Sequence, residues 1–124
     1  MFEMFSDYIN KSINSASIDA WYDDEWYQAK GVMLLEQFTV NDWSRFVSEI
    51  EFKSDTWFEY AIDCLSEFSS SKSKDVIIEL TSVSRKAVAL YAMEAAQDFI
   101  DELTPEIRRK LEKNMRELIL LQLK

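Results

Sequence analysis

Glycine and proline are almost absent from this chain of 124 residues, which contains one of each. The turns that join β-strands depend on glycine, proline, asparagine and aspartate, because these residues favour tight backbone conformations. Hydrophobic residues make up 48% of the chain, so it has enough apolar surface to fold. At this length we expect one domain, residues 1–124, that buries roughly two thirds of its unfolded surface. The sequence therefore predicts a single all-α domain.

Helical spacing and capping residues divide the chain into seven predicted helices. They cover residues 2–13, residues 18–38, a segment capped by Thr39 or Asn41, a segment capped by Ser54, residues 75–80, a segment from Ser84 to Leu103, and a segment opened by Thr104, Pro105 and Glu106. The serine-rich residues 69–74 are predicted to form a loop. Gly31 lies inside the second helix and indicates a close helix contact or a kink there, since glycine costs about 1 kcal/mol relative to alanine.

A helical-hairpin repeat is indicated by apolar positions that recur along the chain. Phe46, Val47, Ile50 and Ser54 recur 30 residues later as Val76, Ile77, Leu80 and Ser84, and Ala61, Leu65 and Phe68 recur 31 residues later as Ala92, Ala96 and Phe99. The spacing resembles a short, degenerate HEAT-like repeat, which predicts stacked antiparallel hairpins, in a single layer pair or a compact bundle. In such a stack the second, fourth and sixth helices line one shared surface.

Four carboxylates follow one another at intervals of four residues in the predicted fourth helix: Asp55, Glu59, Asp63 and Glu67. We call them the carboxylate stripe. Like charges at this spacing repel by a few tenths of a kcal/mol per pair, so a binding surface for a cationic partner is one interpretation. The other is an ordinary solvated face, opposite an apolar face formed by Trp57, Phe58, Ala61, Leu65 and Phe68.

A second candidate surface lies in the predicted second helix, where aromatic and acidic residues alternate. Its members are Asp19, Trp21, Asp23, Asp24, Glu25 and Tyr27. If Tyr22 and Trp26 point inward, with Ala29 and Met33 on the same face, Trp21 and Tyr27 are left at the margin or outside. Exposed aromatics beside carboxylates are typical of interface hot spots, and Tyr60 borders the same surface. The alternative is a central helix with neighbours on both sides.

Charge is distributed unevenly, and it restricts the classes of partner. Residues 1–68 contain 14 acids and 4 bases, a net charge of −10, whereas residues 69–124 contain 9 acids and 10 bases, a net charge of +1. The acidic half repels nucleic acid and anionic membranes and attracts basic proteins.

Without a signal peptide pattern or a long apolar segment, we expect a cytoplasmic protein. The apolar ending, residues 118–123, is either a docked cap or a homodimer contact.

Several kinds of chemistry lack the residues that they require. The chain has no histidine, which removes the usual general base and the histidine-dependent triads and metal sites. A single glycine cannot form a nucleotide-binding loop, and a lone Cys64 is expected to be a small core residue without a disulfide. We therefore expect no catalytic residue, no cofactor and no metal.

In size, acidity, helicity and degenerate hairpins, the chain resembles the immunity proteins of bacterial contact-dependent inhibition and related polymorphic toxin systems. The resemblance spans most of the chain and rests on this general character. It implies a cytoplasmic inhibitor that covers the active site of a basic, nuclease-type toxin domain in a 1:1 complex. Two alternatives remain open: an adaptor or assembly subunit with a HEAT-like surface, and an acidic DNA mimic that inhibits a DNA-binding enzyme.

Overall fold

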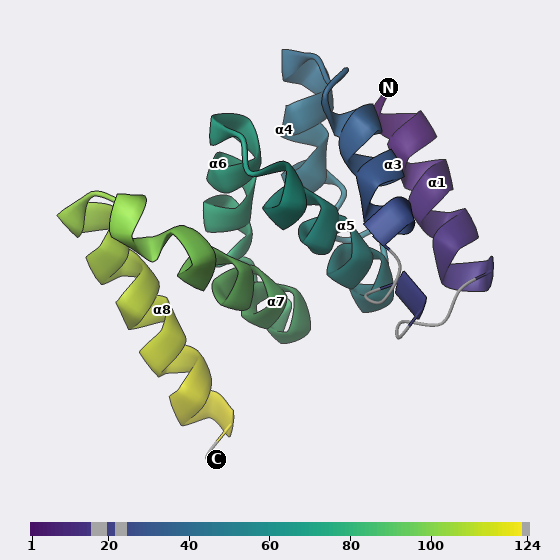
Figure 1. Cartoon of the computed structure of the whole chain (residues 1–124). Coiled ribbons are helices and arrows are strands. Elements are labelled where there is room, and N and C mark those ends of the chain that lie inside the picture. The colour runs from purple at the N-terminus through teal and green to yellow at the C-terminus, as the bar shows by residue number, and fades with distance from the viewer. Residues whose placement is uncertain (16–19, 22–24, 123–124) are drawn as a thin grey trace.

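The computed structural model describes residues 1–15, 20–21 and 25–122, with the side chains of Glu25, Leu121 and Gln122 left aside. All regular structure in these ranges is helical, so the predicted all-α fold is confirmed. The elements are α1 (Phe2–Ser15), α3 (Glu25–Leu35), α4 (Val40–Ser48), α5 (Asp55–Phe68), α6 (Ser71–Leu80), α7 (Lys86–Ala96), the 3-10 segment η1 (Gln97–Glu102) and α8 (Pro105–Gln122) (Figure 1).

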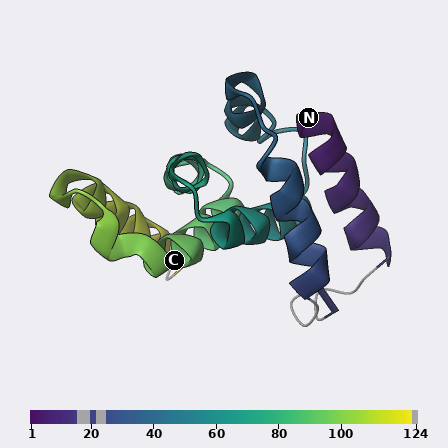
Figure 2. The same cartoon turned by 45° about the horizontal axis from the view of Figure 1, so that its top comes forward.

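The helices are arranged in two rows. In one row α3 packs on α5 and α5 packs on α7, and in the other α1 packs on α4 and α4 packs on α6. The rows are joined by contacts of α1 with α3 and of α6 with α7, while α8 packs on α7 at the end of the molecule opposite α1 (Figures 1 and 2). The second, fourth and sixth predicted helices are thus consecutive neighbours, as stacked hairpins require.

An aromatic cluster holds α1, α4 and α5 together. Phe2 and Phe5 of α1, Phe46 of α4 and Trp57 of α5 are each at most 1% exposed. The Phe2 and Phe46 rings meet edge to face with centroids 5.4 Å apart, and Phe5 and Trp57 do so at 6.2 Å. Such pairs contribute about 0.5–1.5 kcal/mol each beyond the burial of their area. The aromatic residues of the N-terminal half therefore serve mainly as core.

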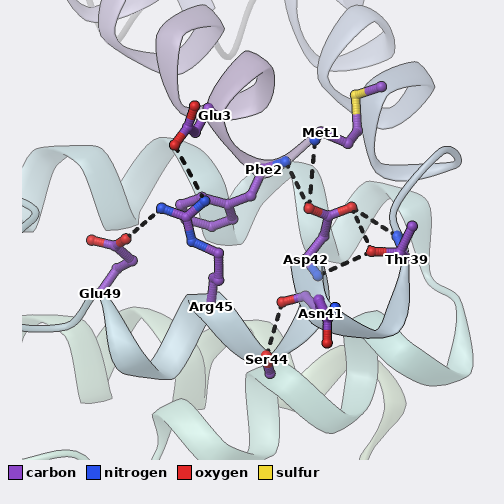
Figure 3. A network of polar contacts seen from close by, with 9 residues as sticks. All are labelled: Met1, Phe2, Glu3, Thr39, Asn41, Asp42, Ser44, Arg45 and Glu49. Atoms are coloured by element: carbon purple, nitrogen blue, oxygen red, sulfur yellow. Dashed lines mark hydrogen bonds and ion pairs between the residues drawn. The ribbon is translucent and has the colours of Figure 1, made fainter.

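A polar network joins the beginnings of α1 and α4 (Figure 3). The Asp42 carboxylate accepts hydrogen bonds from the Thr39 backbone N–H at 2.8 Å and from the Phe2 backbone N–H at 3.0 Å. Thr39 in turn accepts from the Asp42 backbone N–H, which completes a capping box. The Thr39 N–H, with further help from Phe2 and the Thr39 hydroxyl, lowers the pKa of Asp42 to about 2. One carboxylate thus fixes two helix termini.

Three predicted helix starts are confirmed by side-chain caps. Thr39 begins α4, Ser54 accepts from the Trp57 backbone N–H at 3.1 Å, and Thr104 accepts from the Ile107 backbone N–H at 3.3 Å. The predicted Ser84 cap is wrong, because Arg85 occupies the cap position without a side-chain hydrogen bond and α7 begins at Lys86.

Two other predicted boundaries also differ from the structure. The predicted loop over residues 69–74 is largely helix, because Ser70 accepts from the Ser73 backbone N–H at 3.1 Å and starts α6 at Ser71. The helix predicted to reach Leu103 instead ends at Ala96 and continues as η1.

Helix α3 buries a different face from the predicted one. The side chains of Trp26 and Met33 are 60% and 61% exposed, whereas Gln28 and Leu35 are 8% and 1% exposed. The reason is Gly31, which lies so close to α5 that a Cβ atom built on it would be 2.5 Å from the Cys64 Sγ atom. The prediction of a close helix contact at Gly31 is confirmed. The glycine face, not the tryptophan face, therefore packs on α5.

Candidate functional site: an acidic groove between α5 and α7

The carboxylate stripe runs along α5, which lies between α3 and α7 (Figure 1). Because these neighbours approach α5 at different points, the four carboxylates have different surroundings. Asp55 and Glu67 are exposed, whereas Glu59 and Asp63 are half-buried. The stripe is therefore not a uniform solvated face.

Asp55 is neutralised by a cation of the chain itself. The Arg85 guanidinium forms an ion pair with the Asp55 carboxylate and also donates to the backbone carbonyls of Ile50, at 2.7 Å, and Lys53. Arg85 thereby ties the start of α7 to the loop that precedes α5. The first member of the stripe serves this internal contact, so it is a weak candidate for binding a partner.

Asp63 holds a buried tryptophan in place. Its carboxylate accepts a hydrogen bond from the Trp21 indole N–H at 2.9 Å and another from the Gln28 side-chain amide. Burial raises the pKa of Asp63, and the two hydrogen bonds act in the opposite direction by stabilising the ionised form. Glu67 and Glu59 raise its pKa further through charge repulsion. Asp63 is thus a structural residue as well as a candidate for binding a partner.

Two aromatics predicted at the interface belong to the core, which corrects the sequence interpretation. Trp21 is fully buried, and Tyr60 is 2% exposed. Their ring centroids lie 4.7 Å apart, and burial raises the pKa of the Tyr60 hydroxyl. Trp21 is covered because the rings of Tyr8 of α1, Tyr27 of α3 and Tyr60 of α5 pack around it.

The other predicted members of the second surface are only partly visible. Tyr27 is half-buried, and its backbone carbonyl accepts from the Tyr8 hydroxyl at 2.6 Å. Asp19, Asp23 and Asp24 lie outside the described residues, as does the side chain of Glu25. Among the described residues of this region, Trp26 is an exposed aromatic, although its spacing predicted that it points inward.

Two carboxylates of the stripe meet two others, from α7 and η1, in one groove. Glu59 and Asp63 of α5 face Glu94 of α7 and Asp98 of η1 across an open hollow of about 200 Å³, which Ile62, Ser66, Tyr91 and Ala95 complete. Sequence reasoning missed Glu94 and Asp98. The 31-residue repeat offers a signal for both, since it relates Asp63 to Glu94 and Glu67 to Asp98.

The groove is acidic, since four carboxylates line it. Within residues 1–15, 20–21 and 25–122, no ion pair involves Glu59, Asp63, Glu94 or Asp98. The Ser66 hydroxyl donates to Asp98 at 3.4 Å. Burial, together with the negative charge of Glu59 and hydrogen bonding to it, raises the pKa of Tyr91. Tyr91 therefore remains a neutral hydroxyl.

The groove is small, and half of its lining residues are carboxylates. Its volume of about 200 Å³ is below the roughly 300–1,000 Å³ of typical small-molecule sites. In the part of the chain that the structure describes, no three acidic or cysteine side chains are placed to hold a metal ion. Burial raises the pKa of the Cys64 thiol well above its usual range, which keeps the sulfur protonated.

Known proteins give no indication of what the groove binds. No family model, curated protein or solved structure matches the chain. Across the described ranges, none of the helices combines the length and apolar character needed to cross a membrane.

Proposed function

We propose that this protein is a non-catalytic inhibitory binding protein, whose acidic groove captures a basic protein partner in a 1:1 complex. By its resemblance in character to immunity proteins, the proposed partner is a nuclease-type toxin domain whose active site the groove covers. One observation supports this proposal above all: Glu59 and Asp63 of α5, Glu94 of α7 and Asp98 of η1 come together without an internal ion pair among the described residues.

The physical basis is electrostatic complementarity. Nucleases bind phosphate groups through lysine and arginine, and carboxylates held at a fixed spacing can occupy the same cationic groups. Opposite charges steer two proteins together and raise the association rate constant, an effect that falls with ionic strength. The net charge of −9 adds to this attraction at long range. We expect association to slow steeply between about 0.05 M and 0.5 M salt, where the Debye length shortens from above 10 Å toward about 4 Å.

The proposal is tested by growth protection. The C-terminal domain of the protein encoded immediately upstream is expressed in a bacterial host, alone or with this protein. We expect growth arrest from the domain alone and normal growth with the wild-type inhibitor. The groove variant Glu59→Gln/Glu94→Gln/Asp98→Asn should lose protection, and its association rate constant should fall at least tenfold.

A matched control removes the same number of negative charges elsewhere. The variant Glu106→Gln/Glu112→Gln/Glu117→Gln changes three exposed acids of α8 and should still protect. Circular dichroism checks that both variants keep the helicity of the wild type. Equal protection by the groove variant and the wild type would show that the groove carboxylates are only a solvated surface. Equal loss in both variants would show that net charge acts without the groove.

A further inference from the structure

An apolar groove lies next to the acidic one along α7. It is a hollow of about 160 Å³ between α8 on one side and α7 and η1 on the other, and four of its six lining residues are apolar. The residues that line it are Leu90, Met93, Glu94, Gln97, Met115 and Ile119. Glu94 lines both grooves, so the two hollows share one edge of α7.

The apolar groove is a built feature of the α7–α8 junction. Leu111, 1% exposed, fixes α8 in the core, and the Gln97 side-chain amide donates to the Met115 Sδ atom at 3.5 Å. Ile119, at the rim of the groove, is 53% exposed. Methionine adapts its shape to different guests and is common at binding surfaces. A hollow of this size, with Met93 and Met115 in its wall, can receive one apolar side chain.

We propose that this groove binds an apolar anchor side chain of the same basic partner, carried on an amphipathic helix whose cationic residues reach Glu94 and Asp98. This inference rests on the proposed function and extends it, because it specifies the partner's recognition element. An amphipathic helix presents apolar and charged side chains on adjacent faces. Adjacent apolar and acidic grooves are the complement of that pattern.

Charge favours this occupant over a second copy of the chain. A symmetric dimer through the α7–α8 groove would bring two copies of Glu94 and Asp98 close together. Each copy has a net charge of −9, so the pairing would be opposed by repulsion both locally and at long range. The cationic side chains of a basic helix would instead be attracted by Glu94 and Asp98.

Two synthetic helical peptides provide the probe. The first contains arginine and lysine on one face and leucine at positions i, i+4 and i+7 on the other; the second has the same charge, with alanine in place of each leucine. Titration of the isotope-labelled protein, followed by NMR, gives the dissociation constants. We expect the leucine peptide to bind about tenfold more tightly and to shift the methyl signals of Met93, Met115 and Ile119.

Substitutions at neighbouring positions separate the groove from the rest of α8. Ile119→Ser should weaken binding of the leucine peptide about tenfold. Leu120→Ser is the matched control, because Leu120 is 60% exposed on the same helix but does not line the groove. It should leave the dissociation constant unchanged, and both variants should keep the wild-type unfolding midpoint.

Four results would overturn the inference, and the first three of them leave the proposed function standing. Equal affinity for the two peptides, or an unchanged affinity of Ile119→Ser for the leucine peptide, would show that the apolar groove binds no anchor side chain. Either result would leave the role of the acidic groove intact. Wild-type dimerisation in sedimentation experiments that Ile119→Ser abolishes would assign the groove to a second copy. Binding of the leucine peptide that neither salt nor Glu94→Gln/Asp98→Asn weakens would contradict the basic partner, and with it the proposed function.

Discussion

The contact between Gly31 and Cys64 allows the packing of α3 on α5 to be tested by a double-mutant cycle. Alanine favours a helix over glycine by about 1 kcal/mol, so Gly31→Ala would stabilise a helix with free space beside it. Here the added Cβ would lie 2.5 Å from the Cys64 Sγ atom. Overpacking of a core costs about 1–3 kcal/mol. The two effects oppose each other, and we expect Gly31→Ala alone to destabilise the protein by up to about 2 kcal/mol.

Removal of the sulfur should reverse this sign. In Cys64→Ala the nearest α5 atom to the added Cβ is the residue 64 Cβ at 3.5 Å, an ordinary van der Waals distance. Gly31→Ala in that background should therefore stabilise by about 1 kcal/mol. The coupling between the two substitutions is then about 1–3 kcal/mol. Urea unfolding followed by circular dichroism measures all four free energies of unfolding.

An exposed position on the same helix calibrates the cycle. Ala29→Gly lies on the solvent side of α3 and should cost about 1 kcal/mol from helix propensity alone. If Gly31→Ala stabilises equally with and without the sulfur, so that the coupling is below about 0.5 kcal/mol, the close approach of α3 to α5 is refuted.

Three further predictions concern the polar contacts. The folded pKa of Asp42, about 2, is below its unfolded value, so its stabilisation is present above about pH 4 and is lost as the pH falls toward 2. Asp42→Asn should therefore cost about 1–2 kcal/mol at pH 7. In thermal unfolding measured from pH 4 to pH 2, the melting temperature of this variant should fall less than that of the wild type. Asp63→Ala leaves the indole N–H of Trp21 buried without its partner and should cost about 1–3 kcal/mol in urea unfolding; a loss below about 0.5 kcal/mol would refute that role. Arg85→Met loses two backbone carbonyl bonds as well as an ion pair and should lower the melting temperature more than Asp55→Asn does; equal shifts would contradict this difference.

Features set by neighbouring residues in the chain were predictable from the sequence. Thr39, Ser54 and Thr104 cap helices through hydrogen bonds that span three residues, so their position in the chain is enough to identify them. The near-absence of glycine and proline likewise indicated helices throughout. Ser84 and Arg85 show where this reasoning fails, because two adjacent polar residues both suit a helix start.

Features set by distant contacts were not predictable in the same way. The buried face of α3 follows from the approach allowed by Gly31, although apolar spacing pointed to the face with Trp26. The hydrogen bond between Trp21 and Asp63 joins residues 42 positions apart. The carboxylate stripe was predictable, but the surroundings of its members depended on helices that only the fold brings together: Glu59 and Asp63 line the groove, Asp55 forms an ion pair and Glu67 is exposed.

The hydrogen bond from Trp21 to Asp63 has a consequence for how such a protein diversifies. Glu94 and Asp98 are exposed, so under the proposed function substitutions there would change the choice of partner with little effect on folding. A substitution at Asp63 would alter recognition and loosen the interior in the same step. Lineages that exchange one target for another are therefore expected to vary the α7 side of the hollow first and to retain the aspartate that anchors the indole.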